Sequence, residues 1–145
     1  NQNVNFVFIG PIWQDKFVKF GIEKLSRFNN VYLLGSKHFK QVPSYINQFD
    51  VCFAFYKVNL NTKCGDSMKI YEYLALGKPI IATNTGGAER FSNFIKIVNT
   101  AEEFNNALKK CLEEKDENLK IKRIEEVKKH DWKKKVKEML DKLII

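Results

Sequence analysis

Short apolar runs alternate with longer amphipathic segments from Val4 to Val98. The apolar runs are continuous, as expected of strands buried on both faces of a parallel sheet, and turn residues follow most of them. The pattern predicts five strands, at Val4–Ile9, Val31–Leu34, Val51–Phe55, Pro79–Thr83 and Ile95–Val98.

Helical spacing of apolar residues marks the segments between these strands. We expect helices at about Ile12–Phe28, Pro43–Gln48 and Ser67–Leu76, and a polar loop at Lys57–Asp66. Proline suits the first turn of the second helix. The third helix should stop at Gly77, because glycine after a helix and a proline just beyond it form a common stop signal.

After about Ala101 the chain changes to charged, amphipathic sequence that predicts two or three further helices. Strands that alternate with helices through short loops favour an α/β fold, with a parallel sheet flanked by helices. At 145 residues the chain fits a single domain, residues 1–145, with a helical C-terminal segment.

Amino-acid composition and net charge limit the classes of function that fit this chain. The chain is 44% hydrophobic and 29% charged, which indicates a packed globular core. Its formal net charge of +8 leaves open a module that binds RNA or a membrane surface. Acidic residues interrupt the basic ones in the C-terminal helices, however, which favours ordinary solvated helix faces and no nucleic-acid partner.

The residues that commonly hold metals are scarce and scattered. His38 and His130 are the only histidines, and the three cysteines form no CxxC pair. We therefore expect no metal site and no histidine-based catalytic triad. We expect His130 to be an isolated surface histidine and Trp132 to be a packing residue.

Ligands of an open parallel sheet bind at the carboxyl ends of its strands. The helix that begins near Ser67 starts at such an end, and its N-terminal N–H groups and partial positive charge suit a phosphate. Lys69 adds a cation, and Glu72, three residues later on the same face, could accept both hydroxyl protons of a ribose. A surface salt bridge between Lys69 and Glu72 is the simpler alternative.

The stretch MKIYEYLALGKPIIAT, Met68–Thr83, resembles the central motif in the C-terminal domain of GT-B glycosyltransferases, in the group 1 class. Flanking segments are similar too, from LSRFNNVYLLGSKHF before it to HDWKKKVKEML after it, so the resemblance covers nearly the whole chain. It implies a Rossmann-like domain, one half of a GT-B fold, that binds a nucleotide sugar. It also implies that the N-terminal acceptor-binding domain is absent from this sequence, which starts at Asn1 without a Met.

The resemblance assigns roles to matching positions. Glu72 matches the carboxylate that holds the ribose, and Lys69 matches a lysine near the diphosphate. The other expected donor-binding residues lie on the strand-end loops and at the helix start: Gly10, His38, Phe39, Ser67, Met68, Gly86 and Gly87. His38 or Phe39 could stack on the base, although an exposed loop is the alternative there, and a plain tight turn would also explain the glycine pair.

Two departures from the family pattern concern the sugar. Many retaining members carry a second glutamate eight positions before the one that matches Glu72, whereas this chain has Cys64 there and Asp66 out of register. Ser67 replaces the usual proline before the motif. The sugar contacts and the stereochemical outcome stay open, and the chain offers no identifiable catalytic base.

The resemblance implies a glycosyltransferase that takes a sugar from a nucleoside diphosphate, with UDP the expected carrier, and needs no metal or cofactor. The acceptor would be a saccharide or a lipid-linked molecule, in bacterial surface polysaccharide or glycoconjugate synthesis. We expect a cytoplasmic protein, compatible with peripheral contact at the inner face of the membrane. The alternatives are a sugar-nucleotide epimerase of similar fold and the basic RNA- or membrane-surface module.

Overall fold

The computed structural model describes residues 3–13 and 16–143 and divides the chain into two compact units. The N-terminal unit is Asn1–Val42 and the C-terminal unit is Pro43–Ile145. Each unit has its own parallel sheet, so the parallel pairing predicted from the apolar runs is confirmed, in two sheets. That both units belong to one donor-binding domain stays a prediction.

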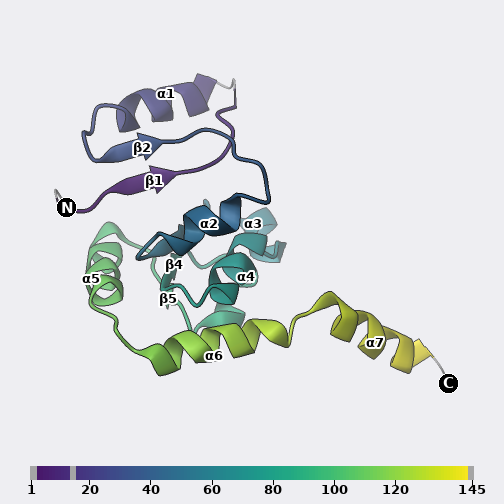
Figure 1. The fold of residues 1–145 in the computed structure, drawn as a ribbon. Coiled ribbons are helices and arrows are strands. Elements are labelled where there is room, and N and C mark those ends of the chain that lie inside the picture. The colour runs from purple at the N-terminus through teal and green to yellow at the C-terminus, as the bar shows by residue number, and fades with distance from the viewer. Residues whose placement is uncertain (1–2, 14–15, 144–145) are drawn as a thin grey trace. The chain divides into compact units, whose positions relative to one another are not determined.

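The N-terminal unit pairs β1 (Phe6–Phe8) with β2 (Val31–Leu33), with Phe6 opposite Val31 and Phe8 opposite Leu33. Helix α1 (Lys16–Leu25) connects the two strands and lies beside them (Figure 1). The predicted helix was longer at both ends. Residues 14 and 15 lie outside the described residues, and at the other end the chain leaves the helix after Leu25 through a turn.

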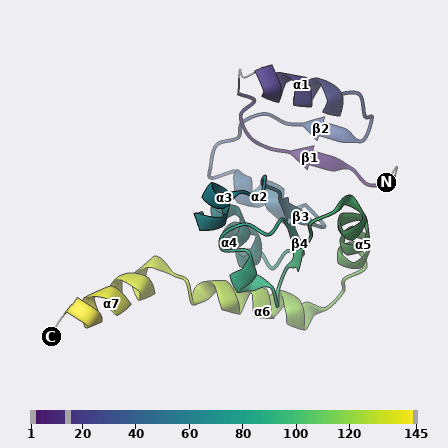
Figure 2. The same ribbon diagram turned by 180° about the vertical axis from the view of Figure 1, so that it is seen from behind.

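The C-terminal unit is built on a sheet of β3 (Cys52–Ala54), β4 (Ile80–Ala82) and β5 (Lys96–Ile97), in the order β3-β4-β5. Strand β4 is central and wholly buried, which explains its unbroken apolar sequence. Two helices, α4 (Met68–Ala75) and α5 (Ala101–Leu112), pack on this sheet, and Figures 1 and 2 show them on opposite sides of it. Helices therefore cover both faces, as predicted.

Helix α4 buries Ile70 and Leu74, one turn apart, against the sheet and leaves Lys69 and Glu72 exposed. It ends at Ala75, Leu76 is its C-cap residue, and Gly77 follows with a φ of +67°. The predicted stop signal is confirmed, because the left-handed region beyond a helix favours glycine.

The remaining elements of the C-terminal unit are short or C-terminal. They are α2 (Val42–Asn47), α3 (Leu60–Cys64), the 3₁₀ turn η1 (Glu89–Phe91), α6 (Glu117–Lys128) and α7 (Trp132–Leu143). The loop predicted at Lys57–Asp66 is partly wrong, since α3 lies inside it. Asn59 and Thr62 explain the helix: each side chain bonds the backbone N–H of the other, which caps its first turn.

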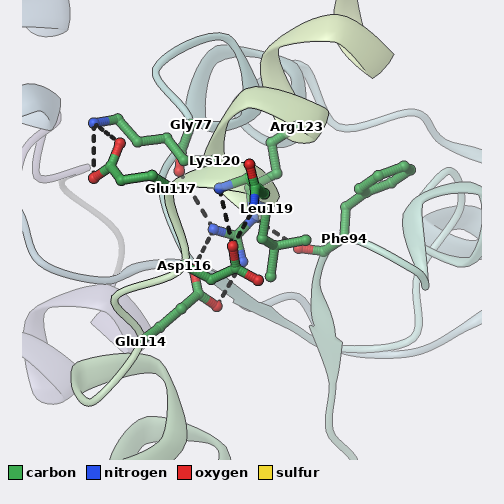
Figure 3. A network of polar contacts seen from close by, with 9 residues as sticks. Gly77, Phe94, Glu114, Asp116, Glu117, Leu119, Lys120 and Arg123 are labelled. Carbon is green, nitrogen blue, oxygen red and sulfur yellow. Dashed lines mark hydrogen bonds and ion pairs between the residues drawn. The ribbon is translucent and has the colours of Figure 1, made fainter.

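Helix α6 is anchored beneath α4 by Arg123, whose side chain is buried (Figure 3). Its Nε donates to the Phe94 carbonyl at 3.0 Å and its Nη1 to the Gly77 carbonyl at 3.4 Å. Nη2 donates to Glu114 Oε2 at 2.8 Å, and Nη1 also bonds the other Glu114 oxygen. A buried charge is tolerated only with such partners. These contacts fix α6 to the end of α4.

Helix α7 follows at the C-terminal end, and none of its described side chains is buried. Across the described ranges, no helix combines the length and the apolar character needed to cross a bilayer.

Candidate donor-binding site

The predicted site residues fall in both units, and each group is described within its own unit. In the C-terminal unit they gather where β3 and β4 end and α4 begins. Tyr56, two residues beyond β3, and Thr83, the first residue beyond β4, bond each other twice. The Tyr56 amide donates to Thr83 Oγ1 at 2.9 Å, and that hydroxyl donates to the Tyr56 carbonyl at 3.0 Å. The two strand ends are thereby held together.

The start of α4 is attached to the same place. The Tyr56 phenol oxygen lies 3.2 Å from Ser67 Oγ, a hydrogen bond in which either group can donate. Ser67 is the N-cap residue of α4, yet its side chain makes no capping bond to the helix. The N-terminal turn of α4 thus lies at the carboxyl ends of the parallel strands, where an open sheet binds its ligands.

Lys69 and Glu72 are both exposed on α4, and the structure does not join them. No ion pair between them occurs among the described residues. The Lys69 ammonium group instead lies 5.4 Å from the centroid of the Tyr56 ring, a cation–π contact. The salt-bridge alternative is therefore wrong. The Lys69 and Glu72 side chains remain available to a ligand.

The other two predicted residues at this helix differ in exposure. Met68, the first residue of α4, is 62% exposed, whereas Ser67 is half-buried by its contact with Tyr56. Tyr56 was not among the residues assigned to the donor. Its segment, 55–57, is nevertheless a candidate from the sequence, because it follows the carboxyl end of a predicted strand.

The glycine pair packs closely against the segment that precedes α4. A Cβ added to Gly86 would lie 1.9 Å from the Gly65 carbonyl oxygen, and the Gly86 amide donates to the Thr62 carbonyl at 2.8 Å. Gly87 has a φ of +82°, and a Cβ there would lie 2.2 Å from Asp66 Oδ1. The pair is more than a tight turn, because only glycine permits this approach of two loops. A contact with the donor phosphates stays a prediction.

Segment 65–67 is also held by side-chain hydrogen bonds to Asp66. Asp66 Oδ2 accepts hydrogen bonds from the Tyr71 hydroxyl at 2.8 Å and from Arg90 Nη1 at 3.1 Å. Burial, together with the hydrogen bond to Asp66, raises the pKa of Tyr71 above its ordinary value. Asp66 is therefore engaged by protein groups.

His130, which we expected to be an isolated surface histidine, is a packed residue. Its ring meets Tyr71 at 5.6 Å and Phe91 at 5.3 Å between centroids, both edge to face, and its Nε2 lies 3.7 Å from Glu126 Oε1. The expectation failed because these partners are far from His130 in sequence, apart from Glu126. Trp132 is 76% exposed among the described residues. The prediction that it is a packing residue is therefore wrong for this part of the chain.

In the N-terminal unit, Gly10 follows β1, and its amide donates to the Gly35 carbonyl at 3.1 Å. The two strand-end loops therefore meet. His38 and Phe39 lie on the second loop, both exposed, with ring centroids 4.7 Å apart. Phe39 is 73% exposed, so an aromatic face is open to a ligand, and base stacking stays a prediction.

No group of His, Cys, Asp and Glu side chains in the described parts of the chain is arranged to hold a metal ion. The groups available to a ligand at α4 are the Lys69 ammonium group, the Glu72 carboxylate and the helix N-terminus. Such a set matches a ligand that carries both phosphate and hydroxyl groups.

The family model for glycosyl transferases group 1 matches residues 1–114. The chain belongs to this family. The family predicted from the Met68–Thr83 stretch is therefore confirmed. This membership favours a transferase over the epimerase and over the basic binding module.

A curated relative, the putative teichuronic acid biosynthesis glycosyltransferase TuaH of Bacillus subtilis (strain 168), is 33% identical over 79 residues. The match spans 54% of this chain and 19% of that protein. The chain thus matches about a fifth of the relative's length.

Two solved structures of Anabaena HepE share the fold. The complex of HepE with UDP superimposes with a TM-score of 0.70 at 18% identity, over 96% of this chain and 41% of HepE. The complex with UDP-glucose gives 0.62 at 16% identity, over 88% of this chain and 40% of HepE. The α/β fold predicted from the sequence is confirmed, and the chain spans about two fifths of HepE.

Proposed function

We propose that this chain is the donor-binding part of a glycosyltransferase that takes its sugar from a nucleoside diphosphate, with UDP as the carrier. The observation that carries the proposal is the start of α4. Lys69 and Glu72 are exposed there and not paired with each other, beside a helix N-terminus at the carboxyl ends of two parallel strands.

Each group has a role that its chemistry suits. Lys69 and the helix N-terminus neutralise the diphosphate and stabilise the charge that develops on it as it leaves. The Glu72 carboxylate accepts hydrogen bonds from the ribose hydroxyl groups. Ser67 and Met68 border the phosphates, and Gly86 and Gly87 bring a second loop close to the segment before α4.

The choice of UDP is supported by HepE, which has been crystallised with UDP and with UDP-glucose. In the N-terminal unit, Gly10, His38 and Phe39 are the residues we assign to the base side of the nucleotide. The exposed Phe39 ring offers a face for stacking.

The remaining parts of the proposal concern the whole protein. A further N-terminal domain supplies the acceptor site. The acceptor is a saccharide or lipid-linked molecule, and the product is a surface polysaccharide or glycoconjugate. This part of the proposal is supported by the relative whose name places it in teichuronic acid biosynthesis. The protein works in the cytoplasm, with peripheral contact at the inner membrane face.

Parallel calorimetric titrations with UDP, GDP and ADP test the nucleotide assignment. They should be run on this chain and on the longest natural protein that contains it. We expect UDP to bind with a Kd between about 1 µM and 1 mM, and at least tenfold more tightly than the other two. Equal binding of all three would contradict the assignment of UDP, and no binding of any would contradict the donor site.

A further inference from the structure

Three polar side chains from three separate segments of the C-terminal unit form a closed triangle. Arg90 Nη1 donates to Asp66 Oδ2 at 3.1 Å and to the Tyr71 hydroxyl at 2.6 Å. The Tyr71 hydroxyl donates to the same Asp66 oxygen at 2.8 Å. Asp66 precedes α4, Tyr71 belongs to α4 and Arg90 belongs to η1. Each side chain therefore fixes the other two.

The Tyr71 ring of this triangle packs against other aromatic rings. The Tyr71 ring meets Phe91 edge to face at 5.1 Å, and Phe91 is fully buried. His130, two residues beyond α6, packs against both rings. The Tyr71 hydroxyl is thus presented at a fixed position, because its ring has little freedom to turn away.

The opposite side of Asp66 faces the glycine pair. Gly87 lies so close that a Cβ there would be 2.2 Å from Asp66 Oδ1. The Gly86 amide donates a hydrogen bond to the Thr62 carbonyl. Segment 62–66 is consequently bound along its length to residues 86–90.

The hydrogen bond between Asp66 and Tyr71 spans the first turn of α4. Ser67, Met68, Lys69 and Ile70 lie between them in sequence. Ser67 itself provides no capping bond. The contacts that Asp66 and Tyr71 make therefore set the position of the backbone amides and of the Lys69 stem from both ends of the turn.

Charge gives Arg90 a second effect. Asp66 is a carboxylate beside a helix N-terminus where, under the proposed function, an anionic diphosphate binds. A neighbouring like charge would repel that ligand. The Arg90 guanidinium pairs with Asp66 and cancels this repulsion.

We propose that Asp66, Tyr71 and Arg90 are positioning residues for the donor diphosphate: the triangle shapes the first turn of α4, and Arg90 also neutralises Asp66. The inference rests on the proposed function, and none of the three residues has to touch the donor.

The test is UDP binding by calorimetry, on this chain and on the longest natural protein that contains it, for Arg90→Gln, Arg90→Lys and Tyr71→Phe. Residues that share one hydrogen-bond network couple strongly, so we expect Arg90→Gln to weaken binding about tenfold. Arg90→Lys keeps the charge but not the guanidinium geometry, so it should weaken UDP binding only about threefold. Tyr71→Phe keeps the packed ring, and loss of its hydroxyl should weaken binding about threefold.

A double variant separates positioning from simple loss of structure. In Arg90→Gln the Asp66 charge is unpaired, so adding Asp66→Asn should restore part of the UDP affinity. A purely structural role predicts the opposite, since the second substitution removes another hydrogen-bond partner. Lys135→Gln, which breaks a similarly exposed pair with Glu138, is the matched control and should bind UDP as the wild type does.

The two proposals fail in different ways. If the wild type binds UDP and Lys69→Ala weakens it, while folded Arg90→Gln and Tyr71→Phe bind normally, the triangle has no positioning role. If the wild type binds no UDP at all, the proposed function fails, and the inference fails with it. Circular dichroism of each variant checks that it is folded. If Arg90→Gln does not fold, UDP binding by Tyr71→Phe tests the positioning role.

Discussion

The Lys69 ammonium group lies 5.4 Å from the centre of the Tyr56 ring, and the phenol oxygen of the same ring lies 3.2 Å from Ser67 Oγ. Tyr56 therefore contacts two residues at the start of α4. Its backbone is bonded to Thr83, beyond the next strand. One aromatic residue thus connects two strand ends to the helix that we assign to the donor phosphates.

Substitutions of Tyr56 should separate the ring from its hydroxyl. The Tyr56 ring holds the Lys69 ammonium group in place before UDP binds, through a cation–π contact that is worth about 0.5–1 kcal/mol at an exposed site. Loss of that preorganisation in Tyr56→Leu should weaken UDP binding about two- to fivefold. Tyr56→Phe keeps the ring under Lys69 and should cost less. Calorimetry with UDP measures both, and equal losses in the two variants would show that the cation–π contact does not matter.

Gly86 should tolerate no side chain. Gly86→Ala would place Cβ 1.9 Å from a backbone oxygen, so the 62–66 segment must move. We expect a loss of more than about 1 kcal/mol in the free energy of unfolding, together with weaker UDP binding. The measurement is urea denaturation followed by calorimetry.

Gly21→Ala is the matched control for that substitution. Gly21 lies within α1 and has nothing within 4 Å of an added Cβ. Alanine in a helix interior should stabilise the chain by about 0.5–1 kcal/mol. A Gly86→Ala variant as stable as Gly21→Ala would contradict the close packing of the two loops.

Arg123 should be the most sensitive charged residue of the α6 anchor (Figure 3). Arg123→Met leaves Glu114 without its partner and two backbone carbonyls without a donor. Breaking a buried pair in this way costs about 3–5 kcal/mol. The double variant Arg123→Met/Glu114→Met should lose less than the single one, as urea denaturation would show. A larger loss in the double variant would count against the ion pair as the cause.

Alkaline pH should act on Tyr71. Its pKa is raised above the ordinary value near 10, first by burial and then by the hydrogen bond to Asp66. A raised pKa in the folded state means stability that is complete below the unfolded pKa and is lost as pH rises through the folded one. Between pH 9 and pH 11 the wild type should lose more stability than Tyr71→Phe. Parallel curves for the two proteins would rule out this contribution.

The sequence predicted those features that depend on local signals. Continuous apolar runs placed the strands, and the Gly77 stop signal placed the end of α4. The family motif located Lys69 and Glu72, but spacing alone could not show that they stay unpaired, since that depends on where the Lys69 side chain finds Tyr56.

What the sequence missed depends on contacts between distant residues. Arg90 contacts Tyr71 from η1, and His130 contacts it from the turn after α6. No periodic pattern in the sequence encodes such contacts. Helix α3 was missed for another reason: a polar five-residue helix has no apolar stripe, and only its Asn59–Thr62 capping pair marks it. The boundary of the two units near Val42 carries no compositional change.

The central claim is that Lys69 and Glu72 bind the diphosphate and the ribose of a UDP-linked donor. It is tested most directly by calorimetry with UDP on wild type, Lys69→Ala and Glu72→Ala, in this chain and in the longest natural protein that contains it. Hydrogen bonds to charged groups contribute about 1.5–3 kcal/mol, so each substitution should weaken binding by roughly ten- to a hundredfold. The account predicts that loss in both variants with the fold intact. UDP binding that is unchanged in both would contradict it.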